Sequence, residues 1–354
     1  MKISFVLPPF SEKPIGGYKI VFQYANQFVA MGHDVTICFL NYLYPEKIPK
    51  TKKIISFLKH KFSGDFEINW FKLDTRVKVL NNIIFASEIP TSDVVVATAV
   101  QTAFWMDNLD ERLGKKVYFI QGYETWAYSE KVLIDSFKLK MKKIVIANWL
   151  KEKINKYTKD KISVVPNFLD GSVYNFAQSI PNRHNIVAMM YHVSDLKNIG
   201  FGMDVLQDVH KVVPNLQVRM FGAYDTPQNL PNYFSYIQDP TQQYLRDQIY
   251  GKAKVYLLPS LSEGWGLTGM EAMSAGSVLV SSDIEGVREY AVNKKNSFLI
   301  TPNKKDIFCN KIISILASED ERVKIARMGV SDIRKYSLAS SAQNMENIFL
   351  NLVR

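Results

Sequence analysis

Two glutamates flank a glycine-containing turn within residues 259–276, and they are the side chains best placed to do chemistry together. The stretch follows an apolar run that predicts a buried strand, turns through Gly264 and Gly266, and continues as a short helix. Such a strand, turn and helix point backbone N–H groups at an anion such as phosphate. Glu263 in the turn and Glu271 in the helix would repel that anion, so we expect them to bind hydroxyl groups. A ligand with a diphosphate between two sugars fits this arrangement.

Two series of alternating strand and helix patterns position this stretch. The first series predicts helices at 18–31 and 149–157 and strands at 3–7, 35–40, 82–86, 94–98, 117–120, 144–147 and 162–165. The second predicts strands at 186–190, 216–221, 255–258, 277–280 and 298–300 and helices at 199–213, 242–250, 267–275, 304–317, 319–334 and 338–353. The alternation predicts α/β units built on parallel sheets, and a polar stretch after residue 171 predicts the linker.

Two loops of the first series follow predicted strands, at the edge where parallel sheets bind ligands. Gly16 and Gly17 close the loop after the first strand; elsewhere such a pair would indicate only a tight turn. The segment 121–128, Gln-Gly-Tyr-Glu-Thr-Trp-Ala-Tyr, follows the strand at 117–120. Its acidic and aromatic side chains predict contacts with a substrate, and aromatic anchors closing an interdomain groove are the alternative.

The positive charge of the chain is concentrated in its first half. Residues 1–168 hold 25 Lys and Arg against 16 Asp and Glu, whereas residues 169–354 hold 19 against 18. This asymmetry predicts an anionic partner for the first half. Residues 51–62 have apolar residues on one helical face among lysines, which suits a helix on an anionic membrane surface. A packed helix with a solvated lysine face is the alternative.

The cysteine content and the apolar runs indicate the cellular compartment to expect. Cys38 and Cys309 are the only cysteines, both lie in apolar patterns, and no disulfide framework is expected. The apolar run at the N-terminus suits a first strand better than a signal peptide, and no run approaches the ~18 apolar residues of a spanning helix. We therefore expect a cytoplasmic protein, with peripheral attachment to the inner face of the cell membrane as an extension of the charge argument.

The motifs together resemble glycosyltransferase family 4 over most of the chain. Glu263 and Glu271, with seven residues between them, match the family signature. Supporting matches are Gly16-Gly17, Gly32-His33-Asp34-Val35-Thr36, Val165-Pro166-Asn167, Lys197-Asn198 and Glu285-Gly286-Val287-Arg288-Glu289. The resemblance implies a GT-B fold, in which two Rossmann-like domains with parallel sheets face each other across a cleft. It implies an acceptor-side domain at 1–168, a nucleotide-sugar-binding domain at 169–337, and a final helix at 338–354 that packs back on the first domain.

The resemblance also implies roles for single residues. Glu263 would contact hydroxyls of the donor sugar, and Glu271 would accept hydrogen bonds from the ribose. Lys197 would neutralise the leaving nucleotide diphosphate, electrostatic work that substitutes for a metal. The diphosphate would also bind backbone N–H groups of Gly266, Leu267 and Thr268. Since the chain has no Asp-x-Asp motif, neither a metal nor a cofactor is expected. A solvated helix glutamate at 271 and a surface lysine at 197 are the structural alternatives.

Two positions depart from the family pattern. His192 occupies the position, five residues before Lys197, where the family often has an arginine, and histidine implies weaker, pH-dependent phosphate binding. Ser194 or Tyr191 would be the compensating group. The first-domain loop has Gln121, Tyr123, Glu124 and Trp126 as candidate sugar or acceptor contacts. A similar Gln-x-Tyr-Glu loop occurs in some rhamnosyltransferase-like members, which implies a deoxyhexose donor.

Three functions stay open at this point. The first is a retaining glycosyltransferase that moves a hexose or a deoxyhexose such as rhamnose from a nucleotide sugar to a glycan or lipid-linked glycan in surface polysaccharide synthesis. The family mechanism implies front-face attack, with Glu124 contacting the acceptor rather than acting as a nucleophile. The second is a sugar-nucleotide epimerase on the same fold, which would need no anionic membrane partner. The third is a non-catalytic binding protein; no compact basic and aromatic motif favours nucleic acid.

Overall fold

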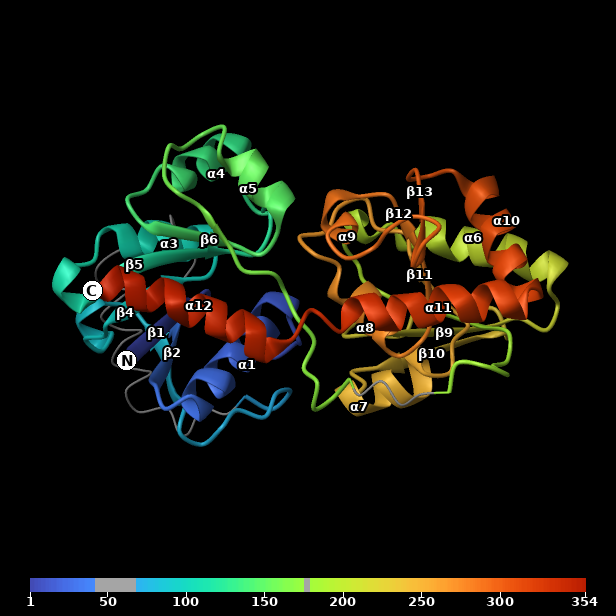
Figure 1. The fold of residues 1–354 in the computed structure, drawn as a ribbon, viewed down its shortest axis with the longest axis horizontal. Coiled ribbons are helices and arrows are strands. Elements are labelled where there is room, and N and C mark those ends of the chain that lie inside the picture. Colours follow the sequence, from blue (N-terminus) through green and yellow to red (C-terminus); the bar gives the residue numbers. More distant parts are fainter. Residues whose placement is uncertain (42–67, 175–178) are drawn as a thin grey trace. The chain divides into compact units, whose positions relative to one another are not determined.

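The computed structural model describes residues 1–41, 68–174 and 179–354. It divides into two compact units (Figure 1). Unit 1 comprises Met1–Asn167 together with Leu338–Arg354, and unit 2 comprises Phe168–Ser337. Each unit has its own parallel sheet, as the alternation of strands and helices predicts.

Unit 1 is built on a seven-stranded sheet with the order β3-β2-β1-β4-β5-β6-β7. Its strands are β1 (Lys2–Leu7), β2 (Asp34–Leu40), β3 (Lys78–Ile83), β4 (Val94–Ala97), β5 (Lys115–Ile120), β6 (Lys142–Val145) and β7 (Ser163–Val164). Its helices are α1 (Gly16–Ala30), α3 (Val100–Asp107), α4 (Glu130–Phe137), α5 (Asn148–Ile154) and α12 (Leu338–Val353), with 3-10 turns at Ala86–Glu88 and Glu111–Leu113. The central strands are buried along almost their whole length, as expected of a parallel sheet covered on both faces.

Unit 2 is built on a six-stranded parallel sheet with the order β10-β9-β8-β11-β12-β13. Its strands are β8 (Ile186–Met190), β9 (Gln217–Gly222), β10 (Phe234–Gln238), β11 (Val255–Leu258), β12 (Val278–Ser282) and β13 (Ser297–Ile300). Its helices are α6 (Ile199–Val212), α7 (Gln242–Tyr244) continued by a π-helical segment (Leu245–Tyr250), α8 (Leu267–Ser274), α9 (Glu285–Arg288), α10 (Lys305–Ala317) and α11 (Glu319–Ile333), with a 3-10 turn at Asp195–Lys197.

Both sheets contain a point where the strand order reverses direction. In unit 1 it lies between β1 and β4, and in unit 2 between β8 and β11. The loops that leave the carboxyl ends of two such strands run to opposite faces of the sheet and leave a crevice between them. The topology therefore places the candidate ligand loops at two defined positions, one in each unit.

The last helix of the described chain packs on unit 1. Figure 1 shows α12 (red) alongside α1 (blue). The ring of Phe349 lies 6.0 Å from that of Phe28, and Glu346 Oε1 lies 2.7 Å from His33 Nε2. The chain passes from unit 1 to unit 2 after Asn167 and returns after Ser337. Close to these two points, within unit 2, the backbone N–H of Leu169 donates to the carbonyl of Tyr336 at 3.0 Å.

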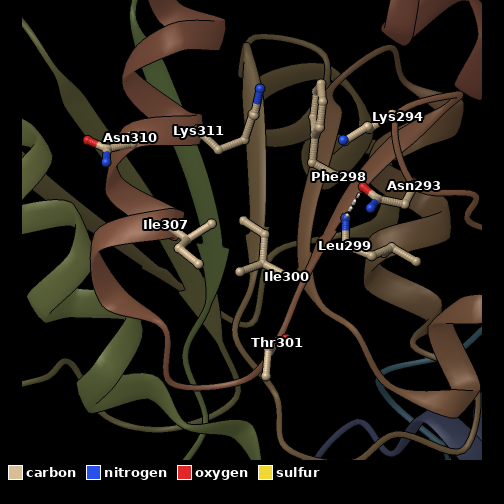
Figure 2. A pocket seen from close by; sticks show the side chains of 9 residues that line it. All are labelled: Asn293, Lys294, Phe298, Leu299, Ile300, Thr301, Ile307, Asn310 and Lys311. Carbon is tan, nitrogen blue, oxygen red and sulfur yellow. Dashed lines mark hydrogen bonds between the residues drawn. The ribbon is translucent and has the colours of Figure 1, made fainter.

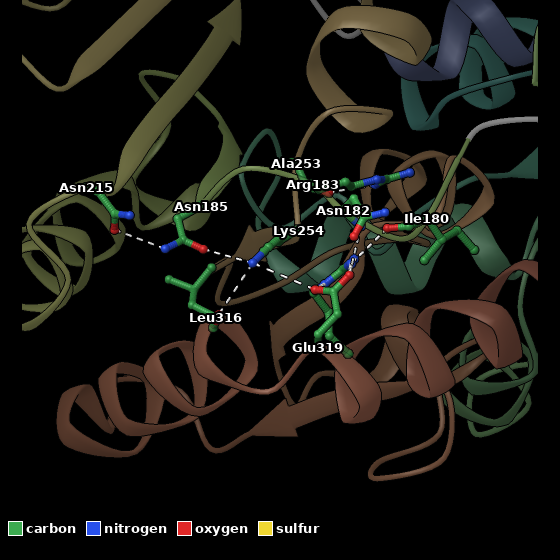
Figure 3. Close-up of polar contacts among 10 residues, drawn as sticks. Ile180, Asn182, Arg183, Asn185, Asn215, Ala253, Lys254, Leu316 and Glu319 are labelled. Atoms are coloured by element: carbon green, nitrogen blue, oxygen red, sulfur yellow. Dashed lines mark hydrogen bonds and ion pairs between the residues drawn. The ribbon is translucent and has the colours of Figure 1, made fainter.

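A polar network fixes the linker against the start of α11 (Figure 3). The backbone N–H of Asn182 donates to Glu319 Oε1 at 2.9 Å, and Lys254 Nζ donates to Asn185 Oδ1 at 2.9 Å. Arg322, which is fully buried, donates to the carbonyl of Ile180 at 2.8 Å and also to Glu319. A buried guanidinium with these partners ties the irregular linker firmly to unit 2.

Several predicted elements differ from the structure. The strand predicted at 82–86 is wrong in its bounds: the strand β3 runs over Lys78–Ile83 at the edge of the sheet, its residues are of mixed polarity, and the apolar run marks only its end. The sequence patterns also missed β10, of which only Phe234 is buried, and α3, which has no polar face because it is largely buried. Cys38 and Cys309 are buried free thiols, as predicted.

Candidate functional site

The strongest candidate site forms where β8 and β11 end, at the reversal point of unit 2. Lys197 closes the 3-10 turn after β8, and its Nζ lies 2.8 Å from both carboxylate oxygens of Glu263. Ser260 Oγ donates to Glu263 Oε1, also at 2.8 Å. The side chains of Lys197 and Glu263 are 23% and 11% exposed, so the ion pair is partly shielded from water. Lys197 is therefore not the solvated surface lysine of the structural alternative.

The glycine turn after Glu263 shapes the start of α8. Gly266 has φ of +86°, a left-handed conformation that favours glycine, and it forms the N-cap of α8. Tyr290 Oη donates to the Gly266 carbonyl at 2.7 Å and fixes the turn. Leu267 and Thr268 form the first turn of the helix, where backbone N–H groups have no partner within the helix. The predicted helix start is confirmed, as is the glycine at its end, since Gly276 has φ of +83°.

The short helix α9 comes very close to the backbone of Glu263. A Cβ atom added at Gly286 would lie only 2.3 Å from the Glu263 carbonyl oxygen. Only a residue without a side chain permits this approach. The loop after β12 thus packs directly against the turn that carries Glu263. In the sequence, only the family resemblance connects this loop with the glutamate signature.

Glu271 is a buried helix residue. It is 4% exposed, and Tyr250 Oη donates to Glu271 Oε2 at 3.1 Å. The solvated helix glutamate of the structural alternative is therefore wrong. A carboxylate at this burial must be hydrogen-bonded, and Tyr250 supplies one of its donors.

His192 is held as a neutral ring. Its Nδ1 accepts a hydrogen bond from the backbone N–H of Ser194 at 3.0 Å, and its Nε2 lies 3.2 Å from Tyr224 Oη. Burial, followed by the charge of Lys197, lowers the pKa of His192 below its usual value. The ring therefore does not supply the permanent charge of an arginine at this position. Tyr191 packs edge-on against Tyr236, with ring centroids 5.7 Å apart.

In unit 1, the glycine pair and the loop after β5 lie together. The helix α1 begins at Gly16, so Gly16 and Gly17 form its first turn rather than closing the preceding loop as predicted. Gln121 Nε2 donates to the Gly17 carbonyl at 3.2 Å. The amide of Gln121 thus ties the loop after β5 to the start of α1.

Glu124 lies on the loop after β5, beside the start of α3. A hydrogen bond from the backbone of Val100 favours the ionised carboxylate, but burial outweighs it and raises the pKa of Glu124 to about 7. A carboxyl group with this pKa exchanges its proton near neutral pH, which is a common property of active-site residues.

The two aromatic candidates of the same loop differ in environment. Tyr123 is buried, its ring lies 3.8 Å below Lys153 Nζ, and its hydroxyl donates to Glu130 at 3.3 Å. Trp126 is 60% exposed and covers Gly122, where an added Cβ would lie 3.2 Å from the indole ring. Tyr123 thus serves the packing of α4 and α5, and Trp126 presents an open aromatic surface.

Sequence patterns did not single out the polar partners of these residues. Ser260, Tyr250, Tyr290 and Tyr224 each contact a predicted site residue. The three tyrosines lie in apolar or irregular segments, where their hydroxyl groups give no periodic signal. The candidate membrane helix 51–62 lies outside the described residues.

A surface depression of about 470 Å³ lies elsewhere in unit 2, between β13 and α10 (Figure 2). Phe298, Ile300 and Ile307 form its apolar part, and Lys311 Nζ lies 4.3 Å from the centre of the Phe298 ring. Asn293 Oδ1 accepts from the backbone N–H of Leu299 at 3.1 Å, which protects the edge strand. The depression shares no lining residue with the candidate site.

Comparison with known proteins relates the second unit to glycosyltransferases. Residues 174–330, all within unit 2, match the family model described as "Glycosyl transferases group 1". The alpha-maltose-1-phosphate synthase of Mycolicibacterium smegmatis is 25% identical over 172 residues, which cover 42% of this chain and 44% of that protein. The chain spans 24% to 44% of the length of curated relatives that it matches.

Solved structures define the fold of the chain. A mutant of S. aureus TarM in complex with fondaparinux, alpha-GlcNAc-glycerol and UDP superposes with a TM-score of 0.74 at 14% identity, covering 98% of this chain and 99% of that chain. Anabaena HepE in complex with UDP and glucose superposes with a TM-score of 0.75 at 14% identity, covering 99% and 100%. The chain therefore has the GT-B fold, two Rossmann-like α/β units with parallel sheets, as the family resemblance implied. Over the described residues, no helix has the length and apolar character required to cross a bilayer.

Proposed function

We propose that this chain is a group 1 glycosyltransferase that moves a sugar from a nucleotide-diphosphate sugar to a glycan or lipid-linked glycan, with retention of configuration. The observation that carries the proposal is the Lys197–Glu263 ion pair, which lies beside the start of α8 at the reversal point of unit 2. A cation, a carboxylate and the N-terminus of a helix together suit a sugar attached to a diphosphate. The match of residues 174–330 to a glycosyltransferase model supports this assignment.

The ion pair gives the donor site a defined response to its ligand. Lys197 donates to both oxygens of Glu263 in the structure, so an entering diphosphate competes with that carboxylate for the ammonium group. When Lys197 turns to the diphosphate, Glu263 becomes available to the sugar hydroxyls. The ammonium and the N–H groups of Gly266, Leu267 and Thr268 then stabilise the charge that develops on the leaving group. This division of labour supports transfer without a metal ion or another cofactor.

The nucleotide and the acceptor are assigned to different units. Glu271 is proposed to bind the ribose, and the presence of UDP in the TarM and HepE complexes makes a uridine nucleotide the first to test. In unit 1, we propose that Glu124 contacts the acceptor hydroxyl and that the exposed ring of Trp126 packs against an acceptor sugar. The Gln121 loop makes a hexose or a deoxyhexose such as rhamnose the donor class to screen.

Attachment to an anionic membrane surface is the remaining part of the proposal. The excess of positive charge in residues 1–168 supports it, since lipid-linked acceptors lie at such a surface. The proposed location is the inner face of the cell membrane, which a cytoplasmic protein reaches by peripheral binding. The surface polysaccharide pathway is likewise a proposal that follows from this location.

The test is a screen of nucleotide sugars by calorimetry and slow hydrolysis, followed by substitution of Lys197. We expect Lys197→Met to weaken UDP binding by about 10- to 100-fold while leaving uridine binding nearly unchanged, because only UDP carries the phosphate charge. Lys252→Met, which removes an exposed lysine of the same unit, is the matched control. NMR of the anomeric proton of the transfer product reports retention.

Three outcomes would contradict parts of the proposal. If no nucleotide sugar binds or is hydrolysed, the chain is not a glycosyltransferase of this kind. If a sugar nucleotide is epimerised without an acceptor, the epimerase is the correct function. If chelator treatment abolishes transfer and added magnesium restores it, the metal-independent mechanism is wrong.

A further inference from the structure

Glu271 lies among buried tyrosines that no sequence motif singles out. Tyr174, Tyr250 and Tyr256 are each at most 2% exposed, and Glu271 is 4% exposed. Tyr250 Oη donates to Glu271 Oε2 at 3.1 Å, and Tyr174 is close enough for the charge of the same carboxylate to raise the pKa of its hydroxyl. Tyr250 therefore holds the carboxylate directly, and Tyr174 lies beside it.

Both phenols beside this carboxylate stay protonated. Burial raises the pKa of Tyr174 and of Tyr250 well above the usual value, and the charge of Glu271 raises both further. Each hydroxyl consequently keeps its proton throughout the physiological range. A phenol that donates to a carboxylate fixes the plane of that carboxylate without neutralising its charge.

Tyr250 is itself fixed by the irregular helix that carries it. It is the last residue of the π-helical segment Leu245–Tyr250, a form of helix frequent at functional sites. Its carbonyl accepts hydrogen bonds from Ser277 Oγ at 2.7 Å and from Arg183 at 3.2 Å. Its ring packs edge-on against Tyr256, with centroids 5.5 Å apart. Backbone and ring together aim the hydroxyl at Glu271.

Tyr174 is fixed from the other end of the same helical segment. Its hydroxyl donates to Gln242 Oε1 at 2.9 Å, and Gln242 is the first residue of α7, which leads directly into the π-helical segment. The single hydroxyl proton of Tyr174 is thus given to Gln242, so Tyr174 acts on Glu271 indirectly, by bracing the helical stretch from Gln242 to Tyr250 that aims the Tyr250 hydroxyl. A merely space-filling aromatic cluster would not need this arrangement of hydroxyl groups.

We propose that Tyr250 and Tyr174 are positioning residues that orient the Glu271 carboxylate toward a ribose, and that they make this site selective for ribonucleoside over deoxyribonucleoside diphosphates. The inference rests on the proposed donor function of unit 2 and extends it to the recognition of the sugar of the nucleotide. A carboxylate with a fixed plane can accept hydrogen bonds from two neighbouring hydroxyls of a ribose at once. A carboxylate that rotates freely loses that geometry and discriminates less against a missing hydroxyl.

The experiment compares the binding of UDP and of 2′-deoxy-UDP by titration calorimetry. The protein is expected to bind UDP at least about tenfold more tightly than 2′-deoxy-UDP. Tyr250→Phe removes one hydroxyl and is expected to weaken UDP binding about tenfold and to bring the ratio close to one. Tyr174→Phe is expected to reduce the ratio in the same direction. Tyr233→Phe, whose ring stacks on His210 at 3.6 Å, is the control and should keep the ratio.

The ratio separates positioning from stability, because a loss of folded protein lowers the binding stoichiometry and leaves the ratio unchanged. An unchanged ratio in both Tyr250→Phe and Tyr174→Phe overturns the positioning role. Glu271→Gln distinguishes this failure from that of the underlying function. If Glu271→Gln loses the discrimination while both tyrosine variants keep it, only the positioning role is wrong. If Glu271→Gln also keeps it, Glu271 does not bind the ribose.

Discussion

At the scale of single residues, the carboxyl group of Glu124 occupies a position that disfavours its ionisation. Its pKa is raised to about 7 by burial, despite a hydrogen bond from the start of α3. A glutamine would fit the same space without a charge to desolvate. The burial of an ionisable group beside a helix start, at the reversal point of a parallel sheet, is therefore better explained by binding or catalysis than by stability.

The raised pKa of Glu124 predicts how the stability of the protein depends on pH. The folded state binds the proton more tightly than the unfolded chain, so the free energy of unfolding falls as the pH rises from about 4.5 to about 7. We expect Glu124→Gln to remove this fall and to be more stable than the natural protein at pH 8 by about 1–3 kcal/mol.

Urea unfolding at pH 5, 6, 7 and 8 measures this effect. Glu152→Gln, which neutralises an exposed glutamate of α5, is the control and should leave the pH dependence as it is. Identical pH profiles for Glu124→Gln and the natural protein would show that Glu124 is ionised as easily in the folded state as in the unfolded one.

Residue types and spacing predicted the charged members of the candidate site better than its neutral ones. Glu263, Glu271 and Lys197 were found because charge, glycine turns and family resemblance mark them. The direct contact of Lys197 with Glu263 could not be predicted, because it depends on β8 and β11 being neighbours in the sheet. Tyr250 could not be identified either, because the π-helical segment that aims its hydroxyl has the apolar pattern of an ordinary helix.

At the scale of elements, the segment from α4 to β7 carries the densest positive charge of the described part of unit 1. Residues 130–164 hold ten lysines against four acidic residues. Lys142 donates to the Lys161 carbonyl, and its pKa is lowered by burial and by neighbouring lysines. Crowding of cations raises the local attraction for an anionic surface.

This segment gives the proposed membrane attachment a test within the described residues. We expect weaker binding to vesicles containing phosphatidylglycerol, with transfer to a soluble acceptor unchanged, when four exposed lysines are replaced by serine: Lys140, Lys156, Lys159 and Lys161. Sedimentation of the vesicles measures the binding. The control removes the same charge from unit 2, at Lys252, Lys294, Lys304 and Lys324. Equal losses in the two variants would mean that net charge, rather than this segment, governs vesicle binding.

Elements with a clear apolar pattern were predicted well from the sequence, and those without one were not. The strand at Val255–Leu258 and the helix at Leu338–Val353 match their predicted ranges, since one is wholly buried and the other has one apolar face. At β10, which is an edge strand with a single buried residue, the apolar pattern is lost. At α3, burial on most sides removes the periodicity from which a helix is recognised.

At the scale of the whole molecule, two units of similar topology carry different chemistry at equivalent positions. Each sheet reverses its strand order once, and candidate side chains lie at that point in both units. In unit 2 the residues there are a lysine and a glutamate in contact, whereas in unit 1 they are a glutamine bound to α1 and a glutamate beside the start of α3, both on the loop after β5. The similarity of fold therefore does not by itself assign a role to either unit.

The position of α12 has a consequence for the order in which the molecule is assembled during synthesis. This helix belongs to unit 1, where Phe349 is fully buried, yet all of unit 2 precedes it in the chain. On the ribosome, unit 2 can thus complete its core while unit 1 still lacks a helix. For chains truncated after residue 337 and released from the ribosome, we expect limited proteolysis to spare unit 2 and to cleave unit 1, and chains that reach residue 354 should protect both. Protection of unit 1 in the shorter chains would show that α12 is dispensable for its folding. Cleavage of unit 1 alone would show that this unit, whose strands are synthesised before unit 2, completes its fold after unit 2.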